Sequence, residues 1–291
     1  MLKIISYIRL LNKKIKLPMI TRLSNRLRVF YKDDNIIVNY GKTLKLYLDL
    51  SKHIDKELYF KSYYREDVSL FIVNELAKII KHNNCLDIGS YNGSLALLMA
   101  ESLDEGGGEV IAVEPNQYSN RLIKFNFNLN SFSNSNLYIE SSAIADKDDM
   151  MTMFLPAKDS WNGGTMAFKS QQQNENIESV DVKTLTIKSL IKKYNFENIG
   201  FIRIDSQGFE HPILSNLFSM NLQNLPILSF CSTVRLYQEN GFKLEDTYKM
   251  LIKNGYKVFQ YKKHFDSWNL VEIKQMLGGQ YIAIHLENKN V

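Results

Sequence analysis

The chain has 291 residues, of which 45% are hydrophobic and 12% are aromatic. This composition excludes global disorder, and the length suits one large α/β domain or a catalytic domain with a small appendage. The 36 Lys and Arg residues against 31 Asp and Glu give a formal charge of only +5, whereas dedicated nucleic-acid binders concentrate far more basic charge. We therefore expect no nucleic-acid partner.

Residues 1–16 are basic and apolar, and Ile4, Ile8, Leu11 and Ile15 fall on one face of a helix. The segment is too short and too charged to cross a bilayer, and it carries no small-residue cleavage site. It is either a helix packed on its own domain or a peripheral contact with an acidic membrane surface. We expect a cytoplasmic protein, located at the inner face of the membrane if this helix binds lipid.

The region before residue 67 is predicted to be this basic helix followed by a small β-rich lead-in. Alternating apolar residues predict its three strands, at 26–31, 36–40 and 44–48. The tyrosine-rich stretch over 51–66 is predicted to be irregular. We therefore take 1–66 as the lead-in and 67–291 as the main domain.

Within the main domain, strand-like apolar runs alternate with helix-like spacing. The predicted strands span 85–89, 110–114, 137–140, 199–205, 226–231, 256–261 and 280–286. A hairpin inserted at about 150–183 interrupts the alternation. The pattern predicts an α/β fold, a doubly wound and mostly parallel seven-stranded sheet with an antiparallel strand near the C-terminus.

The stretch from Cys85 to Pro115 has the order strand, glycine-bearing turn, helix and strand, which is the front half of a nucleotide-binding unit. Its turn has the pattern Asp-x-Gly-x-x-x-Gly, with Asp87 ahead of Gly89. An acid at this place repels a pyrophosphate and attracts the positive charges of S-adenosylmethionine (SAM). Glu114 ends the second strand 25 residues after Gly89, a separation suited to an acid that accepts both ribose hydroxyls.

We therefore expect SAM as the cofactor. Asp87 is expected to meet its amino end, directly or through water, with an acid that merely caps the turn as the alternative. The turn residues Gly89, Asn92 and Gly93 are expected to bind the cofactor, the glycines by letting it approach the backbone closely. No cluster of His, Cys or Asp residues has metal-ligand spacing, so we expect no metal.

Four motifs resemble class I SAM-dependent methyltransferases, and more narrowly the FkbM family. They are Leu86-Asp-Ile-Gly-Ser-Tyr-Asn-Gly93, Val113-Glu-Pro115, Ala143-Ile-Ala-Asp146 and Ile202-Arg-Ile-Asp-Ser-Gln-Gly-Phe-Glu210. The last is similar to the family signature Ile-Lys-Ile-Asp-Val-Glu-Gly-x-Glu. The chain departs from the family at Arg203 and Gln207, and it has Thr186 where the family has an acid. The resemblance implies a Rossmann-like fold.

Four further titratable residues are candidate site residues, and each has an alternative role. The resemblance implies that Asp146 receives the adenine amino group, unless it is a solvated loop acid. Asp205 ends the fourth strand at the carboxyl edge, so it positions the acceptor, acts as a base, or holds the strand-to-helix turn. Glu210 either assists Asp205 or caps the following helix. His211 titrates in a useful range and is either a base or a structural residue.

The resemblance implies a SAM-dependent O-methyltransferase acting on a hydroxyl, of a sugar in a surface polysaccharide or of a secondary metabolite. The partner would then be a glycan or a small molecule. Gln207, Thr186 and the missing acid at the end of the fifth strand leave a second hypothesis open, a SAM-binding but inactive partner module. A nicotinamide oxidoreductase is disfavoured by Asp87. No feature of the sequence indicates an oligomeric state.

Overall fold

The computed structural model describes residues 35–80, 84–154, 178–196, 198–220, 222, 224–264 and 267–287. The predicted N-terminal basic helix, the predicted strand at 26–31 and the connection between the strands of the inserted hairpin lie outside the described residues. No helix within these ranges is long and apolar enough to cross a membrane.

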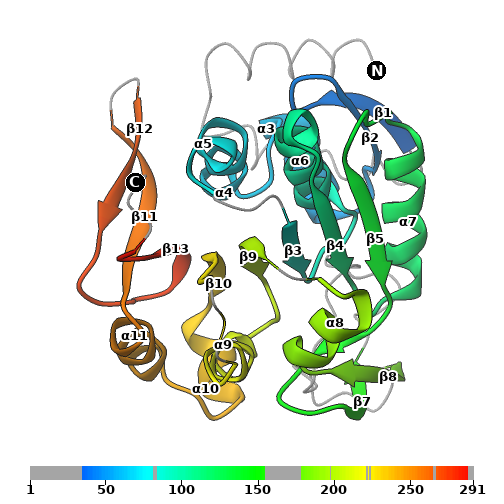
Figure 1. Cartoon of the computed structure of the whole chain (residues 1–291). Helices are drawn as coiled ribbons and strands as arrows, with labels where there is room; N and C mark the ends of the chain where they lie inside the picture. The colour runs from blue at the N-terminus through cyan, green and yellow to red at the C-terminus, as the bar shows by residue number, and fades with distance from the viewer. Residues whose placement is uncertain are drawn as a thin grey trace.

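Within the described residues, the main sheet has eight strands in the order β12-β11-β13-β10-β9-β3-β4-β5. The strands are β3 (Asn84–Ile88), β4 (Glu109–Val113), β5 (Asn136–Glu140), β9 (Ile199–Ile204), β10 (Ile227–Ser232), β11 (Tyr256–His264), β12 (Ser267–Glu272) and β13 (Gly279–His285). Neighbouring strands from β5 to β10 run parallel, whereas β13, β11 and β12 pair antiparallel with their neighbours. Figure 1 shows this order from β5 on the right to β12 on the left.

The predicted fold class, a doubly wound and mostly parallel α/β sheet with an antiparallel strand near the C-terminus, is confirmed. The structure adds one strand, β12, which the sequence did not predict. β12 lies at the edge of the sheet, and only its Trp268 and Leu270 are partly buried. Two half-buried residues give too weak a periodic signal to predict a strand.

Two helix layers cover the two faces of this sheet. One layer contains α3 (His53–Lys61), α4 (Glu66–Phe71), the π-helix η2 (Ile72–Leu76), α5 (Ala77–Ile79), α6 (Ser94–Leu103) and α7 (Gln117–Asn128). The other contains α8 (Ile187–Tyr194), α9 (Glu210–Phe218), α10 (Val234–Glu239) and α11 (Leu244–Lys253), as Figure 1 shows. Alternate strand residues divide between the two cores: Cys85 and Phe201 face the first layer, and Leu86 and Ile202 face the second.

The prediction of an irregular stretch over 51–66 is wrong, because the helix α3 occupies its middle. Leu58, Tyr59 and Phe60 are all buried in succession, and so are Asp55 and Lys56. Burial on nearly all sides of a short helix removes the apolar stripe by which a helix is recognised in a sequence.

The lead-in contains a hairpin of β1 (Asn35–Tyr40) and β2 (Leu44–Asp49), paired antiparallel. Its Leu44, Leu46 and Leu48 belong to the same buried cluster as α6. The division of the chain at residue 66 stays a prediction, but the described part of the lead-in shares one core with the main domain.

The inserted hairpin consists of β7 (Asp149–Phe154) and β8 (Ser179–Leu185), which pair antiparallel. The short strand β6 (Ala143–Ile144) pairs parallel with β8, so the three strands form a small separate sheet. This sheet follows β5 in the chain and brings residues 142–144 to the carboxyl edge of the main sheet.

The backbones of β3 and β9 approach closely at their carboxyl ends, where the strand order reverses. Asp205 N–H donates to the Ile88 carbonyl at 2.9 Å. Gly89 has φ +82°, and a Cβ on it would lie only 2.1 Å from the Asp205 carbonyl oxygen. Glycine is therefore required at this position by the neighbouring strand end.

Gly89→Ala should destabilise the protein more than Gly241→Ala. Both glycines have φ +82°, but a Cβ on Gly241 meets no heavy atom within 4 Å. Each substitution should lower the free energy of unfolding by about 1–2 kcal/mol, because alanine is strained in a left-handed backbone. The clash at Gly89 should lower it further by about 1–3 kcal/mol. Chemical denaturation measures both losses, and equal losses would contradict the close approach of Gly89 to Asp205.

Candidate active site

A cleft opens at the carboxyl ends of β3, β4 and β9, where the strand order reverses. Open α/β sheets bind ligands at such a switch point. The cleft is lined by the loop after β3, the end of β4, the segment around β6 and the loop after β9. The lead-in also contributes two residues, Ile54 from α3 and Tyr64 from the connection to α4.

Glu114 follows β4, lines the cleft and is 5% exposed. Its Oε2 accepts a hydrogen bond from Tyr91 N–H, and its Oε1 accepts one from Asn116 N–H, each at 2.9 Å. A carboxylate has about four acceptor sites, so positions for further donors remain. Burial raises the pKa of Glu114 to about 7. A pair of ligand hydroxyls would stabilise its ionised form.

Asp87 lies at the end of β3 and is fully buried. Its Oδ1 accepts a hydrogen bond from Arg203 Nη1 at 2.9 Å, and its Oδ2 accepts one from Ser90 Oγ at 2.7 Å. The structure therefore gives Asp87 no direct access to a ligand. Its predicted role at the amino end of SAM, directly or through water, stays a prediction. Its hydrogen-bond partners Ser90 and Arg203 do line the cleft.

Asp205 follows β9 and lines the cleft beside Arg203. Its Oδ2 contacts Arg203 Nη2 at 2.7 Å and Arg65 Nη2 at 3.2 Å. Among the described residues, its Oδ1 has no hydrogen-bond partner. Asp87, Arg203, Asp205 and Arg65 thus alternate in sign, and we refer to these four residues as the ion chain.

The turn after β3 divides into residues that face the cleft and residues that face the protein. Gly89, Ser90 and Tyr91 line the cleft. Asn92 is fully buried and bonds to Asp55, and a Cβ on Gly93 would lie 3.1 Å from the side chain of Ile123. Asn92 and Gly93 are not among the residues that line the cleft, so the cofactor roles predicted for them stay predictions.

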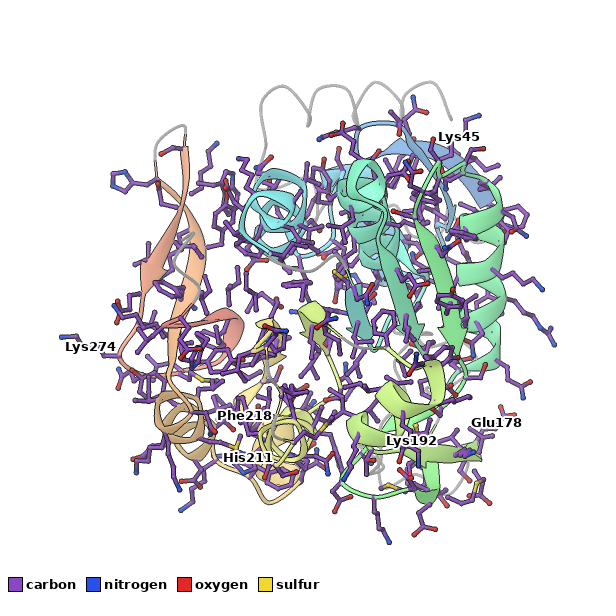
Figure 2. All side chains as sticks on the ribbon, viewed as in Figure 1. Lys45, Glu178, Lys192, His211, Phe218 and Lys274 are labelled. Carbon is purple, nitrogen blue, oxygen red and sulfur yellow. The ribbon has the colours of Figure 1, made fainter. Side chains whose placement is uncertain are left out.

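The remaining predicted site residues lie outside the cleft lining. Asp146 is exposed in the segment after β6. Glu210 is 1% exposed, and its Oε1 accepts from Ser206 N–H at 2.8 Å and Gly208 N–H at 3.3 Å, in the loop that precedes α9. His211 Nδ1 lies 2.8 Å from Thr247 Oγ1, and burial lowers its pKa. Figure 2 labels His211 on α9, in the helix layer below the sheet.

Among the residues that line the cleft or balance its charge, sequence reasoning assigned no role to Tyr64, Arg65, Tyr91 or Ser142. Tyr91 and Ser142 stand next to motif residues, so their positions beside the motifs could have indicated them. Tyr64 and Arg65 carry no motif and precede Asp205 by about 140 residues, so only the fold brings them to the cleft.

The cleft residues fit SAM. Glu114 supplies acceptors for a ribose diol, and Pro115 and Ile144 supply apolar wall beside it. Ser142 is 1% exposed, and its Oγ has no hydrogen-bond partner among the described residues, although it lines the cleft. A buried hydroxyl without a partner is suited to a polar edge such as that of adenine. Among the described residues, no group of three His, Cys, Asp or Glu side chains is placed to hold a metal ion.

Comparison with known proteins gives one family. A family model described as the FkbM methyltransferase domain matches residues 87–258, more than half of the chain. This match confirms the resemblance predicted from the motifs. None of the curated proteins matches the chain.

Solved structures resemble the chain more distantly. The FkbM methyltransferase of Methylobacillus flagellatus KT is 16% identical, with 80% of this chain and 52% of that one covered and a TM-score of 0.43. A SAM-dependent O-methyltransferase of Thermotoga maritima is 13% identical, with 89% and 80% covered and a TM-score of 0.41. The tRNA (uracil-54, C5)-methyltransferase of Pyrococcus abyssi, solved with S-adenosylhomocysteine, is 9% identical, with 86% and 44% covered and a TM-score of 0.42. The family match, and not these likenesses, carries the assignment.

Glu114→Ala should weaken SAM binding by at least about tenfold, because two charge-assisted hydrogen bonds of about 1.5–3 kcal/mol each would be lost. Glu109→Ala is the matched control, since Glu109 starts the same strand at the opposite edge. Isothermal titration calorimetry measures both affinities below the unfolding temperatures. Unaltered SAM affinity in Glu114→Ala would overturn the assignment of Glu114 to the ribose.

Glu210→Gln should change how stability depends on pH. Burial raises the pKa of Glu210 from 4.5 to about 7 in the folded protein. The folded state therefore retains a proton that the unfolded chain releases near pH 4.5, so this stabilisation is complete below that pH and is lost as the pH rises through 7. Thermal unfolding from pH 5 to 8 should show the wild-type midpoint falling relative to that of Glu210→Gln. A constant difference would contradict a buried, protonated Glu210.

Proposed function

Because the chain belongs to the FkbM methyltransferase family, we propose that this SAM-dependent methyltransferase transfers its methyl group to a hydroxyl oxygen. The acceptor hydroxyl belongs to a sugar of a surface glycan or to a secondary metabolite. Methyl transfer and SAM dependence follow from the family. The oxygen acceptor and its chemical class are the proposal. The oxygen acceptor is supported by Asp205 Oδ1 in the cleft wall, which has no hydrogen-bond partner among the described residues.

Bound SAM supplies an activated methyl group for in-line displacement at carbon. The protein must therefore hold cofactor and acceptor in line and receive the proton of a neutral hydroxyl. Glu114 would hold the ribose, and Ser142 would contact the adenine edge. The Gly89–Tyr91 turn would line the methionine portion. These assignments put the cofactor along the β3, β4 and β6 side of the cleft.

The loop after β9 would then receive the acceptor. Asp205, Ser206 and Gln207 line this side, and Tyr64 lines the cleft from the lead-in. Arg203 and Arg65 compensate the charge of Asp205 through Oδ2. Oδ1 is then the oxygen that would accept the acceptor's hydroxyl proton, which a hydroxyl oxygen loses readily once it carries a methyl group. Gln207, where the family has an acid, would offer an amide to a neutral polar acceptor.

A small-molecule or glycan acceptor is preferred over nucleic acid because the chain carries a charge of only +5. A peripheral membrane contact through residues 1–16 and a cytoplasmic location at the inner membrane face remain part of the proposal. Residues 1–16 lie outside the described ranges. Binding of the full chain to lipid vesicles tests the membrane contact.

Turnover is tested by release of S-adenosylhomocysteine over a panel of glycans and hydroxylated small molecules, with mass spectrometry of the product. We expect a product that is heavier by one methyl group and carries it on oxygen. SAM binding without turnover on any acceptor would instead favour the inactive partner module. Methylation of carbon or nitrogen would reject the hydroxyl acceptor while leaving the methyltransferase intact.

Asp205→Asn should lower turnover by about 10²–10⁴-fold, because the proton-accepting oxygen is lost. SAM affinity should change by no more than about threefold, since the cofactor is held by other residues. Asp246→Asn, an exposed acid in the first turn of α11, is the matched control and should turn over as the wild type does. Full turnover in Asp205→Asn would remove Asp205 from the reaction.

A further inference from the structure

The cofactor turn has a conformation that requires support from outside. Tyr91 has φ +52°, in the left-handed region that non-glycine residues rarely adopt. Its N–H donates to Glu114 Oε2 at 2.9 Å. The backbone of Tyr91 therefore positions the carboxylate that would bind the ribose. A turn held in this conformation needs neighbours that fix it, because such a residue is strained by about 1–3 kcal/mol.

Asn92 supplies one such support through its side-chain amide and its carbonyl, all of which are hydrogen-bonded. It is fully buried, and its Oδ1 accepts from Ser94 N–H at 3.1 Å at the start of α6. Its carbonyl accepts from Asn126 Nδ2 on α7 at 2.9 Å. Its Nδ2 donates to Asp55 Oδ1 at 2.9 Å. Asn92 therefore ties the turn to two helices and to the lead-in.

Asp55 is the lead-in partner in this arrangement, and it is 1% exposed. Its Oδ2 accepts from Asp49 N–H at 2.7 Å, so donors occupy both oxygens. Burial raises the pKa of Asp55 to about 7, and the Tyr91 hydroxyl adjoins the same carboxyl. The preceding residue, Ile54, lines the cleft. The helix α3 thus both walls the cleft and holds its turn.

We propose that Asp55 is a positioning residue of the SAM site, holding the turn Ser90–Gly93 through Asn92 in the conformation that binds the cofactor. Asp55 precedes the residues matched by the family model, 87–258, so the family match assigns it no role. The proposal depends on SAM binding in the cleft and not on the identity of the acceptor. Its failure is therefore distinct from a failure of the hydroxyl proposal.

The two side chains allow a swap that tests this role. In Asp55→Asn an amide faces the donor of Asn92, and in Asn92→Asp two carboxyl groups face each other. In the double variant Asp55→Asn/Asn92→Asp, the new amide at position 55 would accept from Asp49 N–H and donate to the new carboxylate at position 92. That carboxylate would still accept from Ser94 N–H. The swap thus restores the pattern of donors and acceptors that each single change breaks.

The experiment measures the Kd for SAM by calorimetry and the unfolding midpoint without SAM for the wild type and all three variants. Each single variant should bind SAM at least about tenfold more weakly, and the double variant should recover to within about threefold of the wild type. Single variants that unfold at lower temperature but bind SAM like the wild type would show a merely structural contact and overturn the proposal. A double variant as weak as the single ones would overturn it as well.

Asn130 provides the matched control. It lies just beyond α7 and bonds the backbone of Lys45 on the β1–β2 hairpin, with Lys45 N–H donating to its Oδ1 at 2.7 Å. Its Nδ2 also donates to the Asn126 carbonyl at 2.6 Å, but among the described residues it makes no direct hydrogen bond to the turn Ser90–Gly93. Lys45 is labelled in Figure 2, at the outer end of the hairpin. Asn130→Ala should lower the unfolding midpoint and leave SAM affinity unchanged.

A milder variant keeps the proposal testable if the single variants fail to fold. Asn92→Ser retains an acceptor near Ser94 but no longer reaches Asp55. It should bind SAM about tenfold more weakly than the wild type, and an unchanged Kd would overturn the proposal. A wild type that does not bind SAM would instead reject the cofactor site itself.

Discussion

The arrangement of the cleft depends on the buried guanidinium of Arg203. This side chain is 4% exposed and lies between Asp87 on the neighbouring strand and Asp205 at the end of its own strand. Its Nη1 also donates to the Gly89 carbonyl at 2.8 Å. A buried charge costs several kcal/mol unless it is paired and hydrogen-bonded. The Arg203 guanidinium, the carboxylates of Asp87 and Asp205 and the Gly89 carbonyl therefore stabilise one another only as a set. The set fixes the ends of β3 and β9 at the point where the strand order reverses.

This pairing separates the cleft into two chemical environments. Near Asp205 and Arg65 the charges are compensated, and one carboxylate oxygen has no hydrogen-bond partner among the described residues. Near Glu114 no cation contacts the carboxyl directly among the described residues, and backbone N–H groups hold it instead. Burial accordingly raises its pKa. A neutral diol with two donors suits the second environment, and a polar acceptor suits the first.

The lead-in contributes to both environments although it lies outside the family match. Arg65 reaches Asp205, Tyr64 and Ile54 line the cleft, and Asp55 holds Asn92. Asn126 on α7 holds the β1–β2 hairpin, because its Oδ1 accepts from Tyr47 N–H at 2.7 Å. Its Nδ2 donates to the carbonyl of Asn92. The described part of the lead-in is therefore a wall of the site and not an appendage to it.

The sequence by itself determined the order of seven of the eight strands of the main sheet and placed Asp87, Glu114 and Asp205 at the strand ends. Parallel strands bring their carboxyl ends to one edge, so these positions follow from local patterns alone. Only the tertiary structure decided what each residue faces. Asp87 is closed off by Arg203, 116 positions away along the chain. Glu210 is buried against the loop after β9, His211 bonds Thr247 in the helix layer, and the helical stretch around Asp55 is buried on nearly all sides. Local spacing cannot encode these outcomes, because charge pairing and helix packing join residues that are far apart in the chain.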